Sequence, residues 1–559
     1  MLHEALLKVK LITMILPALF VRFSYLLPRA VHGVAKGTIK DLNHHRKKMT
    51  SVAVSVFRVQ LCLFSNAQVK RSTIFALSTP PGISAIAVIR ISGPRAADVF
   101  YRLTKVTELP NYRKILLCKL KDPVSMELLD KAIMLWFPSP NSFTGEDVCE
   151  LHIHGGNAVI KSVLNALHKL PHFRFAEAGE FTKRAFLAGK LDLTEVEGLA
   201  DLLHAETEAQ HKQALKQLGG ALHNLYNSWA DKIKKCLARL EAYIDFSEDQ
   251  HLDNTILDTV KCNVDKLKQE IASHLLDKRK GEKLRSGVFA VLVGRPNVGK
   301  SSLLNNLCKR EIAIVSSTAG TTRDIIETSL NLGGYLVNIS DTAGIRETSD
   351  SVEQEGVKRT KERSRKADIL IFVMESKQVL KLMDSYSLKE TDILTYLLRV
   401  ELGEDFFNDL KNLQNSSDEN ECSTHIGMNV ILLLNKIDLL SPEEFQRISH
   451  LENSNPAICA ISSTEGMGMG RFVDHFSRNV QEICCGHRGE EPTITQERHR
   501  QYVQKCYEHL MEFESLLECD IAIAAYNLRN AANELGKITG KIRVDDILDI
   551  IFKDFCIGK

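Results

Sequence analysis

The sequence predicts a multidomain α/β protein with an α+β N-terminal domain, a helical domain, and a doubly wound domain inserted into the helical one. Three observations predict this fold class. A glycine-rich loop follows an apolar run at 288–293, short β-branched runs alternate with a helical stretch between 73 and 193, and leucines recur at spacings of three and four on both sides of the central region. The chain has 559 residues, 44% hydrophobic and 25% charged, which is enough for three or four packed domains.

The first 72 residues form a basic leader. They contain twelve Lys or Arg and only two acidic residues, whereas the whole chain has a net charge of +2. A basic, acid-poor leader is typical of a mitochondrial presequence, which predicts the matrix as the destination. A membrane anchor is the rival interpretation, but the uncharged run Leu11 to Phe20 contains a proline and is followed by Arg22, so it is too short to span a bilayer. We therefore predict no integral membrane insertion, and Met1 and Met49 both stay open as the start.

Residues 73–193 predict the α+β domain. The runs Ile83 to Ile91 and Lys131 to Phe137 are rich in β-branched and apolar residues, as strands are. The stretch Ala158 to Leu170 has the apolar period of a helix.

Two amphipathic runs flank the central region and predict one helical domain. The first run, Leu199 to Ile244, predicts a single helix of unusual length. The second run follows from Tyr502 to Leu517 and from Ile523 to Leu535. Because the ends of a domain commonly lie close together, another domain can be inserted between the two runs. We assign 194–285 and 475–559 to the helical domain, with the charged segment 278–285 as entry linker and 486–492 as exit.

The segment Gly294 to Ser301 reads Gly-Arg-Pro-Asn-Val-Gly-Lys-Ser and fits a phosphate-binding loop. It follows the apolar run Val288 to Val293 and precedes the run Ser302 to Leu307, in the order strand, loop, helix. In such a loop backbone N–H groups surround the phosphates, Lys300 contacts the β and γ oxygens, and the Ser301 hydroxyl binds magnesium. The predicted phosphate-binding residues are Asn297, Val298, Gly299, Lys300, Ser301 and Ser302.

Two further segments belong beside the γ-phosphate. Asp341-Thr-Ala-Gly344 ends an apolar stretch and places a carboxylate near magnesium and a flexible glycine near the phosphate. Between this segment and the phosphate-binding loop, Thr322 is the candidate second hydroxyl on magnesium. The nucleotide-binding residues predicted here are Thr322, Asp341, Thr342, Ala343 and Gly344.

The next motif selects the base. Asn435-Lys436-Ile437-Asp438 follows an apolar run, and Asp438 can accept hydrogen bonds from both N1–H and the N2 amine of guanine, which adenine cannot donate. Ser462 and Ser463 follow a short strand and suit a backbone contact to guanine O6. The four elements in this order predict a Ras-like G domain over 286–474 that binds GTP and Mg²⁺.

GTP hydrolysis needs a group that orients the attacking water. The position that is glutamine in Ras-like switches is Ile345, which cannot hold water. The next carboxylates, which are all candidates from spacing alone, are Glu347, Asp350, Glu353 and Glu355. Spacing identifies no arginine finger, so a metal cation or a partner could neutralise the transition-state charge.

The stretch from about 376 to 429 departs from a compact G domain. It includes the polar run Asn415-Ser-Ser-Asp-Glu-Asn-Glu421. We predict a solvated surface insertion here, and a partner-binding role stays open.

These motifs resemble the MnmE (TrmE) family of tRNA-modification GTPases. The resemblance rests on Gly-Arg-Pro-Asn-Val-Gly-Lys-Ser, Ala-Gly-Thr-Thr-Arg-Asp and Asp-Thr-Ala-Gly-Ile-Arg in the G domain, on the terminal Phe-Cys-Ile-Gly-Lys, and on the N-terminal segments 73–82, 141–147 and 179–193. It covers about Thr73 to Lys559.

For the G domain, the resemblance implies a potassium ion in place of an arginine finger. Asn297, Ser316, Thr318 and Thr321 fall on its potassium ligands, and Ser316 and Thr321 count among the GTP-binding residues. Ser301 and Thr322 fall on the magnesium ligands, and Glu353 falls on the catalytic glutamate that orients water. The resemblance also implies activation by potassium-dependent dimerisation of G domains.

For the other domains, the resemblance implies binding of 5-formyltetrahydrofolate. Arg90, Glu150, Lys190 and Lys559 fall on its folate contacts, and Cys556 is a candidate catalytic thiol near the one-carbon site. It further implies a homodimer formed through the N-terminal domain, a flavin-dependent partner of the MnmG (GidA) type, and mitochondrial tRNA as substrate.

The function implied is an aminomethyl-type modification at carbon 5 of the wobble uridine, with taurine, glycine or ammonia as the amine. A switch in mitochondrial ribosome assembly is the alternative, although such a factor has no evident need for a formyl-folate domain. A catalytically silent scaffold is a third, against which the intact Lys300, Ser301, Thr322 and Asp341 argue.

Overall fold

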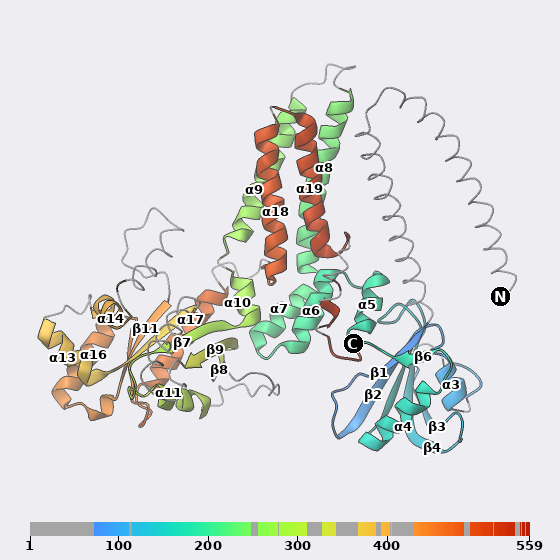
Figure 1. Cartoon of the computed structure of the whole chain (residues 1–559), viewed down its shortest axis with the longest axis horizontal. Helices are drawn as coiled ribbons and strands as arrows, with labels where there is room; N and C mark the ends of the chain where they lie inside the picture. Colours follow the sequence, from blue (N-terminus) through green and yellow to red (C-terminus); the bar gives the residue numbers. More distant parts are fainter. Residues whose placement is uncertain are drawn as a thin grey trace, which may run out of the picture. The chain divides into compact units, whose positions relative to one another are not determined.

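A computed structural model describes two compact units of the chain (Figure 1). The described residues are 72–104, 106–110, 114–246, 255–277, 279–309, 327–341, 367–386, 393–402, 404, 429–485, 492–517, 519–542, 548, 551–553 and 555–559. Within them, the first unit comprises 72–142, 146–176 and Gly558, and the second comprises 143–145, 177–557 and Lys559. The leader predicted over 1–72 lies, except for Ser72, outside the described residues.

The first unit is a six-stranded sheet with helices packed against it. The strand order is β3-β4-β5-β2-β1-β6, and β6 is parallel to β1 while the other pairs are antiparallel. The elements are β1 (Thr73–Leu77), β2 (Ser84–Ser92), α3 (Asp98–Leu103), β3 (Leu116–Lys121), β4 (Leu128–Phe137), β5 (Val148–Gly155), α4 (Asn157–His168) and β6 (Phe173–Phe175). This confirms the predicted strands and helix of the α+β domain.

Alternation along β2 separates the core of this unit from its other face. Ala87, Ile89 and Ile91 are buried in a cluster with α3 and α4, so the residues between them, including Arg90, point to the opposite face. The β2 to β5 register pairs Arg90 with Glu150, which places both side chains on that face. Residues 177–193, which the sequence assigned to the N-terminal domain, pack with the second unit.

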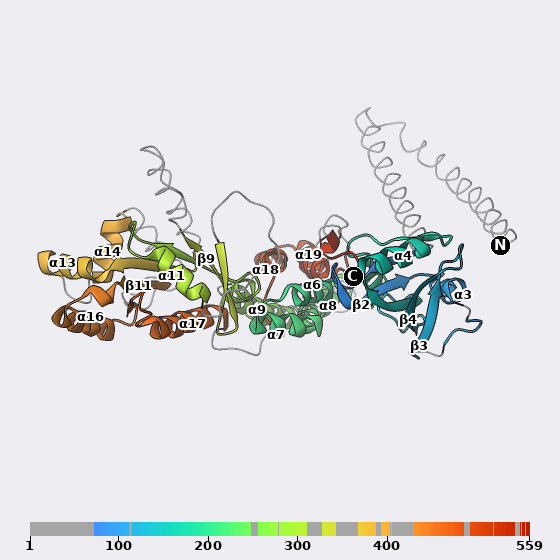
Figure 2. The ribbon, with the colours of Figure 1, turned by 90° about the horizontal axis from the view of Figure 1, so that it is seen from below.

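The helical core combines residues from both sides of the G domain. Its cluster contains residues of α8 (Ala221–Phe246), α9 (Thr255–Leu275), α18 (Glu497–Leu516) and α19 (Ile521–Thr539). Figures 1 and 2 show these four helices side by side. Trp229 and Tyr226 of α8 are fully buried there and make an edge-to-face contact. One helical core thus contains residues from both sides of the G domain.

The prediction of one long helix over Leu199 to Ile244 is wrong. The segment forms three helices, α6 (Leu193–His204), α7 (Glu208–Leu218) and α8. Thr207 and Gln210 form a capping box that starts α7. Gly220, with φ of +81°, breaks the chain between α7 and α8. The apolar spacing continues through both breaks, so periodicity alone does not reveal where one helix ends and the next begins.

The G domain is a second six-stranded sheet of order β12-β11-β10-β7-β9-β8, parallel except for the β8–β9 hairpin. Its strands are β7 (Val288–Val293), β8 (Glu327–Leu332), β9 (Tyr335–Asp341), β10 (Ile369–Glu375), β11 (Asn429–Asn435) and β12 (Ile458–Ala460). One buried cluster includes α11 (Lys300–Leu307) and α17 (Met469–Cys485), and the other includes α13 (Ser376–Tyr386), α14 (Ile393–Leu402) and α16 (Pro442–Ser454). Helices on both faces confirm the doubly wound fold.

Three boundaries differ from the sequence prediction. The stretch from 376 is not a solvated insertion throughout, because Val379 and Leu380 of α13 and Leu397 of α14 are buried in the core. The polar run 415–421 lies outside the described residues. The G-domain core continues past 474 through α17, since Phe476 and Val480 are buried in it. The predicted entry linker is helix α10 (Lys280–Ser286).

No helix in the part of the chain that the structure describes is both long enough and apolar enough to cross a membrane.

Candidate functional site

The phosphate-binding loop joins β7 to α11 with glycines at its two tightest points. Gly294 has φ of +154°, and a Cβ there would lie 2.2 Å from the Val373 carbonyl oxygen. Gly299 has φ of +102°, and a Cβ there would lie 2.1 Å from the Asn435 side-chain nitrogen. No side chain fits at either position, so the glycines allow the loop to turn back over the strand ends.

Lys300 is the first residue of α11 and is only 5% exposed. Its Nζ donates hydrogen bonds to the carbonyl oxygens of Gly294 at 2.5 Å and Arg295 at 2.9 Å. These bonds hold the ammonium group across the mouth of the loop, where a phosphate oxygen is a natural partner. Asn297, with φ of +61°, and the hydroxyl residues Ser301 and Ser302 are exposed at the same end of α11.

Asn435 connects the phosphate-binding loop to the two guanine loops. Its Nδ2 donates to the Val298 carbonyl oxygen at 2.7 Å. Its Oδ1 accepts from both the backbone N–H and the hydroxyl of Ser463, each at 3.0 Å. Asn435 is 2% exposed, so one buried amide holds three predicted segments together. The structure therefore brings together Val298, Asn435 and Ser463 as the sequence motifs imply.

The base-recognising residues flank this amide. Lys436 has φ of +65°, and its Nζ lies 3.3 Å from Glu375 Oε2. Asp438 lies on the short helix η2 (Ile437–Leu439) and is exposed, so its carboxylate is accessible to a base. The Ser462 hydroxyl is buried and accepts from the Glu465 N–H at 3.1 Å, which shapes the second loop.

Two supporting residues, Asn306 and Ser376, are not predicted by the sequence motifs. Asn306 of α11 donates from Nδ2 to the Ser463 carbonyl oxygen at 2.8 Å. Ser376, at the start of α13, donates from its hydroxyl to the Asn435 carbonyl oxygen at 2.7 Å. Both contacts join segments more than 50 residues apart, and no spacing in the sequence signals them.

The residues expected beside the γ-phosphate are only partly described. Asp341 ends β9, and the register pairs it with Leu292, so the end of β9 lies beside the end of β7. The other predicted residues of this group lie outside the described residues: Ser316, Thr318, Thr321, Thr322, Thr342, Ala343, Gly344 and Glu353.

In the first unit, the candidate folate residues Arg90 and Glu150 contact each other. Arg90 Nε donates to Glu150 Oε1 at 2.9 Å, and the two side chains are 19% and 17% exposed. His152, which the sequence did not predict to be part of this site, has its Nε2 at 3.6 Å from Glu150 Oε2. A carboxylate held by a guanidinium on a sheet face can accept from an amino and N–H edge, such as that of a pterin.

The other candidates in this group belong to the second unit. Lys190 follows α5 (Glu180–Leu187) and is exposed, and its backbone N–H donates to the Ala185 carbonyl oxygen at 2.9 Å. The Lys559 N–H donates to the Cys556 carbonyl oxygen at 3.2 Å.

The Cys556 thiol is exposed, whereas the preceding Phe555 is buried and anchors the chain end. Burial raises the pKa of the Cys118 thiol to about 11 and that of Cys149 well above its usual value. Accessible and buried thiols differ in reactivity, so Cys556 is the better placed of these three for chemistry.

The fold and the loops define a P-loop G domain joined to a helical domain and an α+β domain. A family model described as MnmE helical domain matches residues 193–556, and one described as GTP-binding protein TrmE N-terminus matches 73–190. The chain belongs to the MnmE/TrmE family and is a GTP hydrolase.

Relatives match along nearly their whole length. The 5-taurinomethyluridine-[tRNA] synthase subunit GTPB3, mitochondrial, of Danio rerio is 46% identical over 92% of this chain and 98% of its own. The protein of the same name from Homo sapiens is 43% identical over 87% of this chain and 93% of its own. The tRNA modification GTPase MnmE of Parvibaculum lavamentivorans is 42% identical over 87% of this chain and 100% of its own.

Proposed function

We propose that this chain is a mitochondrial, potassium-activated GTPase required for an aminomethyl-type modification at carbon 5 of the wobble uridine of mitochondrial tRNAs. The main support is the joint presence of a guanine-nucleotide site, built around Lys300 and Asn435, and the Arg90–Glu150 pair on a separate sheet. The names of the mitochondrial relatives favour taurine as the amine and a mitochondrial location, for which we propose the matrix. GTP hydrolysis in this scheme drives a conformational cycle.

In the G domain, the chain's own residues bind and orient the nucleotide. Lys300 stabilises negative charge on the phosphates, and Asp438 selects guanine. We propose Ser301 and Thr322 as magnesium ligands, and Asn297, Ser316, Thr318 and Thr321 as potassium ligands that also border the nucleotide. The exposed Ser301 hydroxyl and Asn297 side chain fit oxygen coordination of hard cations. Bound cations would supply positive charge near the γ-phosphate, and Glu353 would orient the attacking water.

In the first unit, we propose that Arg90 and Glu150 bind 5-formyltetrahydrofolate, with Lys190 and Lys559 as further contacts. The support is the 2.9 Å ion pair on a sheet face away from the core. A carboxylate suits the donor edge of the pterin, and cationic side chains suit the glutamate tail. The proposed partners are an MnmG (GidA)-type flavoprotein, mitochondrial tRNA, and a second copy of this chain, which would pair through the N-terminal domain and transiently through the G domain.

Nucleoside mass spectrometry of mitochondrial tRNAs tests the proposal. Cells lacking the protein should lose the carbon-5 substituent on wobble uridine, and wild-type protein should restore it. Lys300→Ala should not restore the substituent because it does not bind GTP. Glu353→Ala should not restore it because it hydrolyses bound GTP slowly. Cys556→Ser should also not restore it, although its GTP turnover stays normal. Unchanged tRNA in the deleted cells would contradict the proposal. Ribosome profiles would then test the assembly-switch alternative.

A further inference from the structure

The turn of the β8–β9 hairpin contacts the first turn of helix α7. The Ala209 N–H, at the second position of α7, donates to the Gly334 carbonyl oxygen at 3.1 Å. Gly333 and Gly334 form this hairpin turn with φ of +60° and +89°. The first N–H groups of a helix have no acceptor within the helix, so a carbonyl from another element can bind there.

The same turn of α7 also binds the end of α10. Gln210 Nε2 donates to the Arg285 carbonyl oxygen at 2.9 Å, while Gln210 Oε1 accepts from the Thr207 N–H at 3.2 Å. Arg285 in turn donates from Nε to Asp201 Oδ1 of α6 at 2.6 Å. Four consecutive residues, Thr207 to Gln210, thus contact both the hairpin and α10, and we call them the α7 contact turn.

Both of these neighbours lead directly to the nucleotide site. β9 runs from the hairpin turn to Asp341, and β8 begins at Glu327, five residues after Thr322 in the sequence. α10 is followed at once by β7, which ends at the phosphate-binding loop. Because segments beside the γ-phosphate change position during a GTPase cycle, a displacement of β8, β9 or β7 along its length reaches the α7 contact turn.

A polar cavity leaves space for such a displacement. It has a volume of about 530 Å³, and the residues lining it include Asp201, Gln210, Gln213, Arg285, Ser286 and Thr495. Close-packed apolar cores resist sliding, whereas hydrated polar contacts can rearrange. The α7 contact turn therefore has this cavity on one side and the β8–β9 hairpin on the other.

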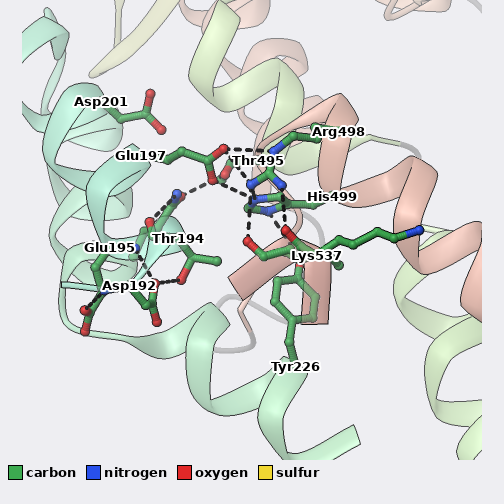
Figure 3. Close-up of polar contacts among 12 residues, drawn as sticks. Asp192, Thr194, Glu195, Glu197, Asp201, Tyr226, Thr495, Arg498, His499 and Lys537 are labelled. Atoms are coloured by element: carbon green, nitrogen blue, oxygen red, sulfur yellow. Dashed lines mark hydrogen bonds and ion pairs between the residues drawn. The ribbon is translucent and has the colours of Figure 1, made fainter. Parts of the chain in front are cut away.

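At the cavity itself, Glu197, one of the residues that line it, joins α6 to α18. Glu197 of α6 accepts from Arg498 at 2.8 Å and contacts His499 Nε2 at 2.7 Å, and Figure 3 shows the three side chains converging. His499 is fully buried and Glu197 is 5% exposed. A movement of α6 and α7 would accordingly be passed to α18 and the helical core.

We propose that the α7 contact turn is a positioning element that transmits the nucleotide state of the G domain to the helical domain. This inference rests on the proposed GTPase cycle and deepens it. Ala209 is the key position, since its backbone N–H joins α7 to the hairpin, and Gln210 is the second, since its side chain joins α7 to α10.

The test is hydrogen–deuterium exchange of the full-length protein with GDP and with a non-hydrolysable GTP analogue. In wild type, exchange within 193–218 should differ by about fivefold or more between the two nucleotides. Ala209→Pro removes the N–H donor, which lies in the first turn of α7 and makes no hydrogen bond within the helix, and should abolish this difference while GTP affinity and turnover stay within about twofold. Glu208→Pro is the matched control, because Thr207 is already extended, and should keep the difference.

A nucleotide-dependent difference that persists in Ala209→Pro would overturn the proposal. The proposal would also be overturned if wild-type protein binds and hydrolyses GTP but shows the same hydrogen exchange within 193–218 in both nucleotides. Absence of GTP binding and hydrolysis would instead refute the proposed function. If Ala209→Pro loses its helical circular dichroism, the variant cannot be interpreted, and hydrogen exchange of the wild-type Ala209 amide provides the test instead. Equal protection of this amide in both nucleotides would contradict the proposed transmission through the α7 contact turn.

Discussion

Asn435 donates a 2.7 Å hydrogen bond from its side-chain amide to the carbonyl oxygen of Val298 in the phosphate-binding loop. This residue of the guanine-recognition motif thus links the two halves of the nucleotide site. Its other amide atom binds Ser463, so the same side chain aligns three loops at once. Nucleotide affinity should therefore depend on Asn435 through the geometry of these loops.

Asn435→Ala should lower GTP affinity by about 100-fold. The substitution leaves the Val298 carbonyl and the Ser463 N–H buried without their partner, which costs about 1–3 kcal/mol for each group. Titration of a fluorescent guanine nucleotide measures the effect. Asn453, exposed on α16, offers the control Asn453→Ala, which should bind like wild type. Near-normal affinity in Asn435→Ala would mean that the loops are aligned by other contacts.

Asp438→Asn should change base preference from guanine toward xanthine. The carboxylate accepts two N–H groups of guanine, whereas an amide at the same place can donate to the oxygen that replaces the N2 amine. We expect GTP affinity to fall by about 100-fold and xanthosine triphosphate to bind better than GTP. Competition binding with both nucleotides measures this preference. If the variant keeps its preference for GTP, Asp438 does not read the base.

GTP turnover should be about tenfold or more faster in potassium than in sodium at equal ionic strength. A potassium ion that replaces an arginine finger acts on the transition state, so its effect should appear in kcat. Asn297→Ala should remove the difference between the two salts while leaving GTP binding nearly intact. Steady-state phosphate release in the two salts measures it, and equal wild-type rates would exclude potassium activation.

Glu197 should make the helical domain sensitive to acid. Burial by itself raises the pKa of this carboxyl, but the charges and hydrogen bonds of His499 and Arg498 outweigh burial and hold the pKa below the usual 4.5. A carboxyl with a lowered pKa stabilises the fold above pH 4.5, and that contribution is lost as the pH falls through the lowered value.

Glu197→Gln should therefore lose about 3 kcal/mol near neutral pH, because the buried charges of its partners are left uncompensated. Between pH 5 and 3 its Tm should fall less steeply than that of wild type. Thermal melts followed by circular dichroism across this range measure both effects. Glu508→Gln on the exposed face of α18 is the control and should follow wild type. Parallel pH profiles for wild type and Glu197→Gln would refute the assignment.

The sequence predicted those parts of the fold that depend on local pattern. The strand, loop and helix from Val288 to Leu307 were found because an apolar run of strand length meets a glycine-rich loop. The division of 199–244 into three helices was not predicted, because the breaks at Thr207 and Gly220 do not interrupt the apolar period. Contacts such as Asn306 with Ser463 depend on tertiary packing and leave no local signal.

Helix α13 is a second case in which the local sequence pattern did not predict the packing. Its sequence carries enough charge to be read as solvated, yet Val379 and Leu380 are buried under β10 and β11. An amphipathic helix presents only one face to the core, and a short stretch of it resembles a polar insertion when the partner surface is unknown.

Glu150→Gln should weaken binding of 5-formyltetrahydrofolate by about tenfold or more. The neutral amide keeps the shape of the side chain and can still accept from Arg90, but it offers one acceptor oxygen where the carboxylate offers two, and it lacks the charge that favours a pterin donor edge. Isothermal titration calorimetry with the full-length protein measures the loss. Glu127→Gln, at an exposed position just before β4, is the matched control.

GTP turnover should be unchanged in both variants, since the pair lies in the first unit and the nucleotide site in the second. Wild-type folate affinity in Glu150→Gln would remove this pair from the proposed one-carbon site while leaving the GTPase assignment intact.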